Sequence, residues 1–327
     1  MKDSNNNELN IGMIGAGRIA KFHLAALVSV GLNVSNIAAS RGSSNVYKFA
    51  KENNIGNVWS DPREMISKAK CDALVILAPT EPTLELLKLA MSFNVPILVE
   101  KPITHNSRDF EKLDLSRNDV MVGYNRRFYP AIQNLRKVIS ACSYVNLKVE
   151  IPETILDDNL SKRSKFYPVF QNSVHMLDLI QYLVGKLKLE SRLESQTANP
   201  LSSISGLLST KTGHTVNLLF NFNAPANFSL IVDAAESRYT LCPIEEISYF
   251  RGMSVSEPTN ERPFRIYSPK LISNTRSDPR ESTIKPGFHL QALAFKNLIN
   301  NIPDNNFATL STSYNLVKLV EQILEVK

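Results

Sequence analysis

Apolar and polar positions follow two different rhythms along this chain, and the change between them comes near Gly123. Up to this residue, short runs that are apolar at nearly every position precede stretches with an apolar residue every three or four positions. The first pattern is typical of strands buried on both faces, and the second is typical of amphipathic helices. Strands that alternate with helices predict a parallel, doubly wound α/β sheet over residues 1–123.

The elements expected in this first domain can be bounded from the same pattern. A good helix start is Asp61-Pro62-Arg63-Glu64, because Asp caps, Pro suits the first turn and Glu can reach back to the cap. The predicted strands cover residues 11–14, 34–39, 73–78, 95–99 and 119–123, and the other predicted helices cover 18–30, 45–53, 83–93 and 107–115.

After Gly123 several strand patterns follow one another without helices between them. Such a succession predicts an antiparallel sheet, so residues 124–327 are expected to form an α+β domain with a large, mainly antiparallel open sheet. The polar residues 252–284 are predicted to be a long loop. The expected strands are 144–151, 204–209, 215–221, 228–234, 239–242 and 247–250, and the expected helices are 130–140, 174–184, 287–301 and 311–326.

Composition narrows the class of protein. A chain of 327 residues with 43% hydrophobic and 21% charged residues fits two soluble domains. No apolar run is long enough for a membrane helix, and the polar residues 1–10 do not resemble a signal peptide, so we expect a cytoplasmic protein. The net charge of +6 is scattered rather than gathered into a stripe, which argues against nucleic-acid binding. Three widely spaced cysteines predict neither a disulfide framework nor a metal site.

The strongest local motif follows the first predicted strand and reads Gly15-Ala16-Gly17-Arg18-Ile19-Ala20. Gly15 allows a tight turn, Gly17 lets the backbone approach a pyrophosphate, and Ala20 lets the next helix pack close to the strand. The start of that helix offers N–H groups and a positive dipole end to the phosphates. This strand, motif and helix predict a dinucleotide-binding site that includes residues 15–19.

The residues at the end of the second predicted strand indicate which form of the cofactor's ribose the protein binds. An acidic residue there would bind the 2′-hydroxyl of NAD, but the chain reads Ala39-Ser40-Arg41. Arg41 can pair with a 2′-phosphate, and Ser40 can donate a hydrogen bond to it. We therefore expect NADP(H) to be favoured, with NAD(H) as the alternative.

With these features in place, the chain resembles the Gfo/Idh/MocA family of oxidoreductases, named after glucose-fructose oxidoreductase, inositol dehydrogenase and a rhizopine catabolism protein. The resemblance implies an N-terminal Rossmann domain. It rests on the order and spacing of four motifs: Gly15 to Ala20, Glu100-Lys101-Pro102, Gly123-Tyr124-Asn125-Arg126-Arg127-Phe128, and His175-Met176-Leu177-Asp178. A further match, Lys285-Pro286-Gly287-Phe288, is similar to members associated with sugar or surface-polysaccharide metabolism.

The resemblance implies that Lys101 is catalytic and lies beside both the nicotinamide and the reacting carbon. An ammonium there lowers the cost of developing alkoxide charge and can relay a proton. Glu100 is expected to hold Lys101 or to contact the ribose. The bond before Pro102 is expected to be cis.

The resemblance also implies a catalytic role for His175, whose imidazole titrates near neutral pH. Many relatives have Asp where this chain has Gln171, and Gly where it has Ser173. Gln171 cannot ionise, so it is left to hydrogen-bond the substrate, or Asp178 orients His175 instead. On a continuous α-helix, Gln171, His175 and Asp178 would share one face.

Other contacts are expected around these residues. Asn125 and Arg126, at the domain junction, are expected to reach the cofactor or an anionic substrate group, and Tyr167 to reach the substrate. Ala78, Pro79 and Thr83 are expected to contact the cofactor.

Taken together, these features predict hydride transfer between a nicotinamide and a hydroxyl or carbonyl carbon of a sugar or a nucleotide-linked sugar. Two alternatives stay open: a catalytically silent cofactor-binding sensor or scaffold, and an epimerase or glycoside-eliminating enzyme that oxidises its substrate transiently. No metal is expected. By resemblance, the open face of the second sheet is expected to form a homodimer or homotetramer.

Overall fold

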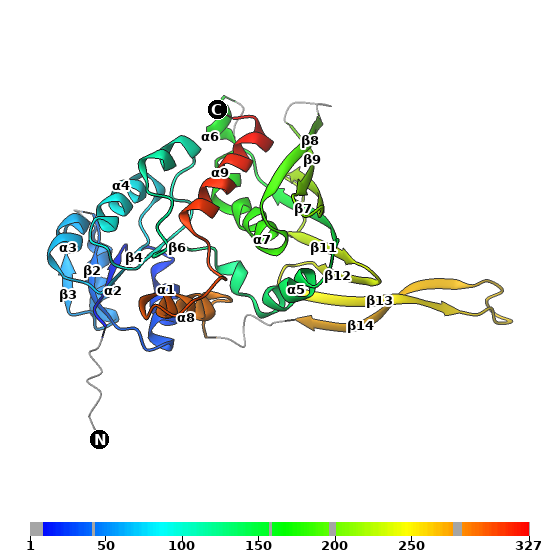
Figure 1. The fold of residues 1–327 in the computed structure, drawn as a ribbon, viewed down its shortest axis with the longest axis horizontal. Coiled ribbons are helices and arrows are strands. Elements are labelled where there is room, and N and C mark those ends of the chain that lie inside the picture. Colours follow the sequence, from blue (N-terminus) through cyan, green and yellow to red (C-terminus); the bar gives the residue numbers. More distant parts are fainter. Residues whose placement is uncertain (1–8, 41–42, 157–158, 196–200, 277–282, 327) are drawn as a thin grey trace, which may run out of the picture. The chain divides into compact units, whose positions relative to one another are not determined.

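The computed structural model describes residues 9–40, 43–156, 159–195, 201–276 and 283–326. They pack into two compact units, each built on one sheet (Figure 1). The first unit takes its described residues from Met1–Tyr129 and Ser282–Lys318, and the second from Pro130–Glu281 and Leu319–Lys327. The sequence predicts that residues 124–327 form the second domain, whereas residues 283–318 group with the first unit.

The first unit contains a six-stranded sheet in the order β3-β2-β1-β4-β5-β6, and its paired strands are all parallel. This confirms the doubly wound α/β prediction. The strands are β1 (Ile11–Ile14), β2 (Val34–Ala38), β3 (Asn57–Trp59), β4 (Ala73–Ile76), β5 (Ile97–Val99) and β6 (Val120–Val122). The helices are α1 (Ala20–Ser29), α2 (Ser44–Glu52), α3 (Pro62–Lys68), α4 (Thr80–Met91) and α8 (Phe288–Ile299). As predicted, Asp61 caps α3 by accepting a hydrogen bond from the Arg63 N–H.

The late helix α8 belongs to the first unit because it shares a hydrophobic core with α1. Leu24 and Leu27 of α1 lie in one buried cluster with Phe288 and Phe295 of α8. At its start, Gly287 has a φ of 81°, and a Cβ there would lie 2.2 Å from the Asn125 carbonyl oxygen. Only glycine allows this close approach, so Gly287 lets the start of α8 pack against the backbone of Asn125, which follows β6.

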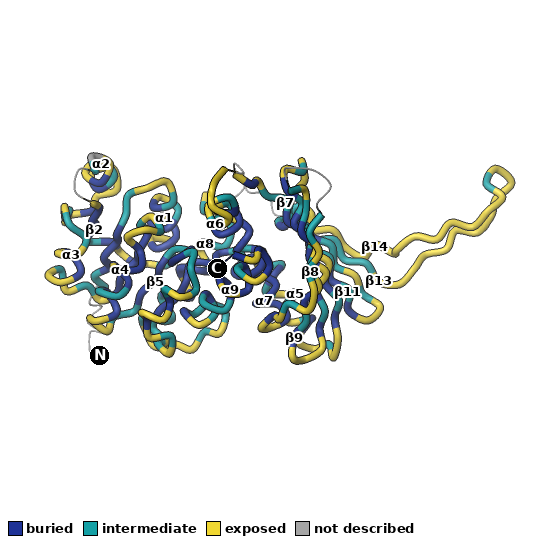
Figure 2. Tube along the Cα trace, turned by 90° about the horizontal axis from the view of Figure 1, so that it is seen from above, coloured by how far each residue is buried: buried dark blue, intermediate teal, exposed yellow. Residues whose placement is uncertain are grey.

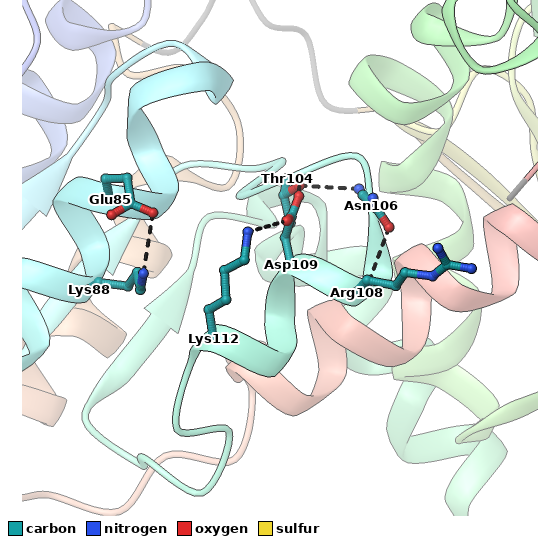
Figure 3. A network of polar contacts seen from close by, with 7 residues as sticks. All are labelled: Glu85, Lys88, Thr104, Asn106, Arg108, Asp109 and Lys112. Atoms are coloured by element: carbon teal, nitrogen blue, oxygen red, sulfur yellow. Dashed lines mark hydrogen bonds and ion pairs between the residues drawn. The ribbon is translucent and has the colours of Figure 1, made fainter.

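The segment after β5 is held by short-range polar contacts (Figure 3). The Thr104 hydroxyl donates to Asp109, and the Asn106 side chain accepts from the Arg108 N–H. Lys112 pairs with Asp109 at 2.8 Å. Residues predicted as an α-helix at 107–115 form instead the 3₁₀-helix η1 (Ser107–Lys112), and a second 3₁₀-helix, η2 (Asn125–Phe128), follows β6.

The second unit contains an eight-stranded sheet in the order β14-β13-β12-β11-β7-β10-β9-β8. Its pairs are antiparallel except β7 with β10, so the sheet is mixed and mainly antiparallel, which confirms the predicted fold class. The strands are β7 (Asn146–Glu153), β8 (Leu187–Ser195), β9 (Ser203–Thr210), β10 (Thr215–Phe222), β11 (Ser229–Ala234), β12 (Ser237–Leu241), β13 (Glu246–Ser256) and β14 (Ile266–Arg276).

Helices accompany this sheet within the second unit. They are α5 (Pro130–Ser140), α6 (Lys162–Lys165), the π-helix η3 (Val169–Ser173) and α7 (Val174–Val184), and α9 (Leu310–Leu324) ends in this unit. Apart from half-buried His175, every residue of α7 is buried, which agrees with its almost wholly apolar sequence (Figure 2).

The loop predicted at 252–284 is wrong over much of its length. Strand β13 continues to Ser256, and β14 pairs with it to form an exposed hairpin (Figure 2). Its pattern was hidden because serine and proline interrupt the apolar positions and every residue of β14 is exposed. Strands β3 and β8 were also missed. None of the helices in the described part of the chain is both long and apolar enough to span a membrane.

Candidate functional site

The glycine turn after β1 has the form of a phosphate cradle. Gly15 has a φ of 110°, and a Cβ there would lie 2.7 Å from the Leu77 carbonyl oxygen, so glycine is required. At Gly17 a Cβ would meet no protein atom within 4 Å and would enter open space. Ile19 stands at the N-cap of α1 and has no polar side chain to cap the first turn. N–H groups of this turn can therefore donate to a phosphate, so these residues fit a dinucleotide.

The predicted ribose contacts are only partly described. Ser40 is exposed just beyond β2, whereas Arg41 lies outside the described residues. Strand β2 is tied to the turn because the Gly15 N–H donates to the Ala38 carbonyl at 2.8 Å. The preference between NADP(H) and NAD(H) therefore stays a prediction.

Ala78, Pro79 and Thr83 come together after β4, the strand next to β1. The Thr83 side chain is buried, and its hydroxyl lies 2.8 Å from the Pro79 carbonyl and 3.2 Å from the Ala78 carbonyl. Thr83 thus fixes the turn that enters α4. Carboxyl ends of adjacent parallel strands share one edge of a sheet, so this turn and the Gly15 turn lie on the same edge.

Glu100 and Lys101 follow β5 at that edge, and Glu100 is held in place. Its Oε1 lies 2.7 Å from Nε2 of His23, and its Oε2 accepts a hydrogen bond from the Lys101 N–H at 3.2 Å. A Cβ on Gly123 would lie 2.9 Å from Oε1, so glycine leaves room for this carboxylate. The Lys101–Pro102 peptide bond is cis, as expected.

The electrostatic environment of Lys101 favours loss of its proton. Burial is the largest influence and lowers the pKa of Lys101. Glu100 opposes this shift, whereas the neighbouring cations Arg126 and Lys285 lower the pKa further. A lysine with a lowered pKa can exchange a proton nearer neutral pH than an exposed one.

Asn125 joins the same part of the first unit. Its side-chain amide donates to the Pro286 carbonyl at 3.1 Å, which ties η2 to the segment before α8. The first unit therefore brings together the phosphate cradle, Lys101, Asn125 and Arg126. Lys285, from the Lys285-Pro286-Gly287-Phe288 match, is a charged neighbour of Lys101.

The remaining predicted residues lie in the second unit. The Gln171 amide donates to the Tyr167 hydroxyl at 3.0 Å, so these two substrate candidates contact each other. His175 is half-buried near the start of α7. Gln171 lies in the π-helix η3 rather than in α7, so the expected α-helical spacing from Gln171 to His175 is interrupted.

Two residues in the site regions were not singled out from the sequence. One is His23, which lies on an otherwise apolar face of α1, where a polar residue could have indicated its contact with Glu100. Glu153, at the end of β7, accepts hydrogen bonds from the hydroxyl of buried Ser173 at 2.7 Å and from the Asn172 amide at 3.1 Å. Among the described residues, no group of three His, Cys, Asp or Glu side chains could hold a metal ion.

Comparison with known proteins agrees with this geometry. Residues 9–124 match the model of the GFO_IDH_MocA oxidoreductase family, which has an NAD-binding Rossmann fold. Over these residues the chain is similar to that family. The matched range contains the cradle, the Glu100-Lys101-Pro102 motif and Gly123.

Individual proteins are also similar to this chain, at low sequence identity. The chain is 26% identical over 187 residues to the uncharacterized oxidoreductase YrbE of Bacillus subtilis, which covers 53% of each chain. It is 25% identical over 205 residues to inositol 2-dehydrogenase 4 of Saccharopolyspora erythraea, which covers 55% of each. The match thus spans about half the length of these relatives. Among solved structures, levoglucosan dehydrogenase in complex with NADH and levoglucosan has a TM-score of 0.74, with 16% identity and coverage of 97% of this chain and 96% of that one.

Proposed function

We propose that this protein is a nicotinamide-dependent oxidoreductase that transfers a hydride between its cofactor and a hydroxyl or carbonyl carbon of a sugar or sugar derivative. One observation carries the proposal. The cradle at Gly15 and Gly17 and the half-buried Lys101 lie at the same edge of one parallel sheet, after β1 and β5. Ligands of open α/β sheets bind at this edge.

The residues of the first unit suit proton transfer coupled to hydride transfer. When bound, the nicotinamide would supply the hydride acceptor or donor. Lys101 is assigned the proton of the substrate hydroxyl, because its lowered pKa lets Nζ accept that proton and its ammonium form stabilises alkoxide charge. Asn125 and Arg126 are assigned to polar or anionic groups of the substrate or cofactor.

We assign His175 as the second catalytic residue and Gln171 and Tyr167 as substrate-binding residues. His175 is half-buried, and imidazole is the side chain most often used for general acid–base transfer. Gln171 can only hydrogen-bond, and it already pairs with Tyr167, so the two together present an amide and a phenol to a hydroxyl-rich ligand.

The finer cofactor and substrate assignments rest on different support. Arg41 without a nearby acidic residue favours NADP(H), with NAD(H) as the alternative. A sugar-like substrate is supported by relatives named for inositol and levoglucosan. Three unpaired cysteines, Cys71, Cys142 and Cys242, are consistent with a cytoplasmic protein.

We also propose a homodimer or homotetramer formed through the open face of the eight-stranded sheet. That face presents apolar side chains to solvent, with Leu193 73% and Leu207 41% exposed. These two leucines line a pocket on this face together with Leu219 and Ile231 of neighbouring strands. Apolar patches of this kind are typical of protein interfaces. Light scattering that gives a monomer mass would contradict this assembly.

The proposal is tested by incubating the protein with polyols, free sugars and nucleotide-linked sugars, each with NAD⁺ or NADP⁺. Reduced nicotinamide is followed by its absorbance, and Lys101→Ala is the matched inactive variant. Turnover lost in the variant supports the proposal. Cofactor binding without turnover across the panel would favour a sensor, and product without net change in free cofactor would favour transient oxidation.

A further inference from the structure

His23 is a buried polar residue that the proposed reaction has not used so far. It lies on the buried face of α1, the helix that follows the phosphate cradle, and is 2% exposed. Its Nε2 lies 2.7 Å from Oε1 of Glu100, 77 positions further along the chain. An ionised carboxylate can only accept, so Nε2 carries the proton and donates it in this hydrogen bond.

The imidazole ring is itself fixed by packing. Phe288, the first residue of α8, meets it edge to face at 4.9 Å between ring centroids. Gly287 and the Asn125–Pro286 hydrogen bond set the start of α8, and therefore the place of Phe288. Phe288 thus packs against the ring of His23, while Nε2 of His23 contacts Glu100 in the candidate site.

Glu100 in turn has little freedom. Its Oε1 faces His23 and lies against Gly123, where even a Cβ would come within 2.9 Å. Its other oxygen accepts from the Lys101 N–H, and its charge stabilises the Lys101 ammonium. A carboxylate in this position is the negative partner of a lysine that also has Arg126 and Lys285 as neighbours.

From these contacts we infer that His23 is a positioning residue, which holds the Glu100 carboxylate in the orientation that sets the protonation and placement of Lys101. The inference rests on the proposed function for the catalytic role of Lys101, but the hydrogen-bond chain itself does not. These hydrogen bonds also connect α1, the helix that follows the phosphate cradle, to Lys101 at the end of β5.

Three substitutions separate this role from simple packing. His23→Gln keeps an amide N–H that can reach Glu100, whereas His23→Leu fills similar space without a donor. His23→Asn keeps a polar side chain that is too short to reach. His289→Leu is the matched control, because His289 also contacts α1, through Ser29 at 2.8 Å, but is exposed.

The first readout needs neither cofactor nor substrate. Limited acylation of the folded proteins, followed by peptide mass spectrometry, gives the labelling rate of Lys101 against pH. Without a fixed Glu100 the ammonium loses its partner, so Lys101 in His23→Leu and His23→Asn should label several-fold faster, by roughly threefold to tenfold. His23→Gln and His289→Leu should follow the wild-type profile.

The second readout is steady-state kinetics with a substrate found by the panel above. Loss of a hydrogen bond to a charged group predicts a fall in kcat of roughly tenfold to hundredfold in His23→Leu, with KM nearly unchanged. His23→Gln should restore most of kcat. Unchanged labelling in both His23→Leu and His23→Asn, or His23→Gln as impaired as these two, overturns the inference. If the wild type shows no turnover but Lys101 still labels faster in His23→Leu and His23→Asn, the result counts against the proposed reaction and not against this inference.

Discussion

Substitution of Gly17 by alanine separates the stability of the fold from the seating of the cofactor. The backbone at Gly17 is outside the left-handed region, and the new Cβ would meet no protein atom within 4 Å. Alanine also restricts the unfolded chain, so the free energy of unfolding should stay level or rise by about 0.4–1 kcal/mol. The same Cβ projects into the space that the proposal gives to a pyrophosphate.

The expected cost therefore falls on binding alone. Crowding by one methyl group against a bound phosphate should weaken dinucleotide affinity by roughly tenfold to hundredfold, or about 1.4–2.7 kcal/mol. Gly56→Ala is the matched control, because Gly56 is exposed between α2 and β3 and its Cβ would also meet nothing. Urea denaturation measures stability, and titration calorimetry measures affinity. If Gly17→Ala binds the dinucleotide as tightly as Gly56→Ala does, the cradle is not where the phosphates lie.

Three further predictions address the lysine, the second unit and the cofactor's ribose. Lys101→Met should lower kcat/KM by about 10²-fold or more. Because the folded-state pKa of Lys101 is lowered, its ammonium destabilises the native state below that pKa, so the variant should be more stable than wild type in urea near pH 7 and lose this advantage as pH rises toward roughly 10. Glu153→Ala should cost about 1–3 kcal/mol in urea denaturation, because the buried Ser173 hydroxyl loses its acceptor, whereas Glu153→Gln should cost less; equal costs would contradict this role. Arg41→Ala should weaken NADP⁺ binding by roughly tenfold in calorimetry and leave NAD⁺ binding unchanged, and an equal loss for both cofactors would refute a 2′-phosphate contact.

Local signals in the sequence predicted much of the first unit. The Asp61 cap and the run that forms β4 depend on neighbouring residues, and the Gly15 turn is marked by a local glycine motif, so these patterns can be read directly. Helices α5 and α7 were predicted with the bounds that the structure gives. Strand β3 was missed because three residues are too short to show a rhythm.

Features that depend on distant partners could not be predicted in this way. The hairpin of β13 and β14 is exposed and mixes serine with apolar residues, so its strand pattern resembles a polar loop. The π-helix at Val169–Ser173 changes the spacing before His175, and no pattern in the neighbouring residues predicts it.

The same limit applies to the polar contacts of the site. Glu100 and Lys101 were found through a motif, but the pairing of His23 with Glu100 joins residues 77 positions apart. The contact of Ser173 with Glu153 likewise joins a helix to a strand end. Pairings of this kind become visible only when the chain is folded.

A crystal structure of the protein grown with NADP⁺ would test the central proposal most directly. We predict a dinucleotide whose pyrophosphate lies on the turn from Gly15 to Gly17 and whose nicotinamide ring lies beside Lys101. A dinucleotide bound elsewhere, or its absence from crystals grown at saturating concentration, would contradict the proposed function.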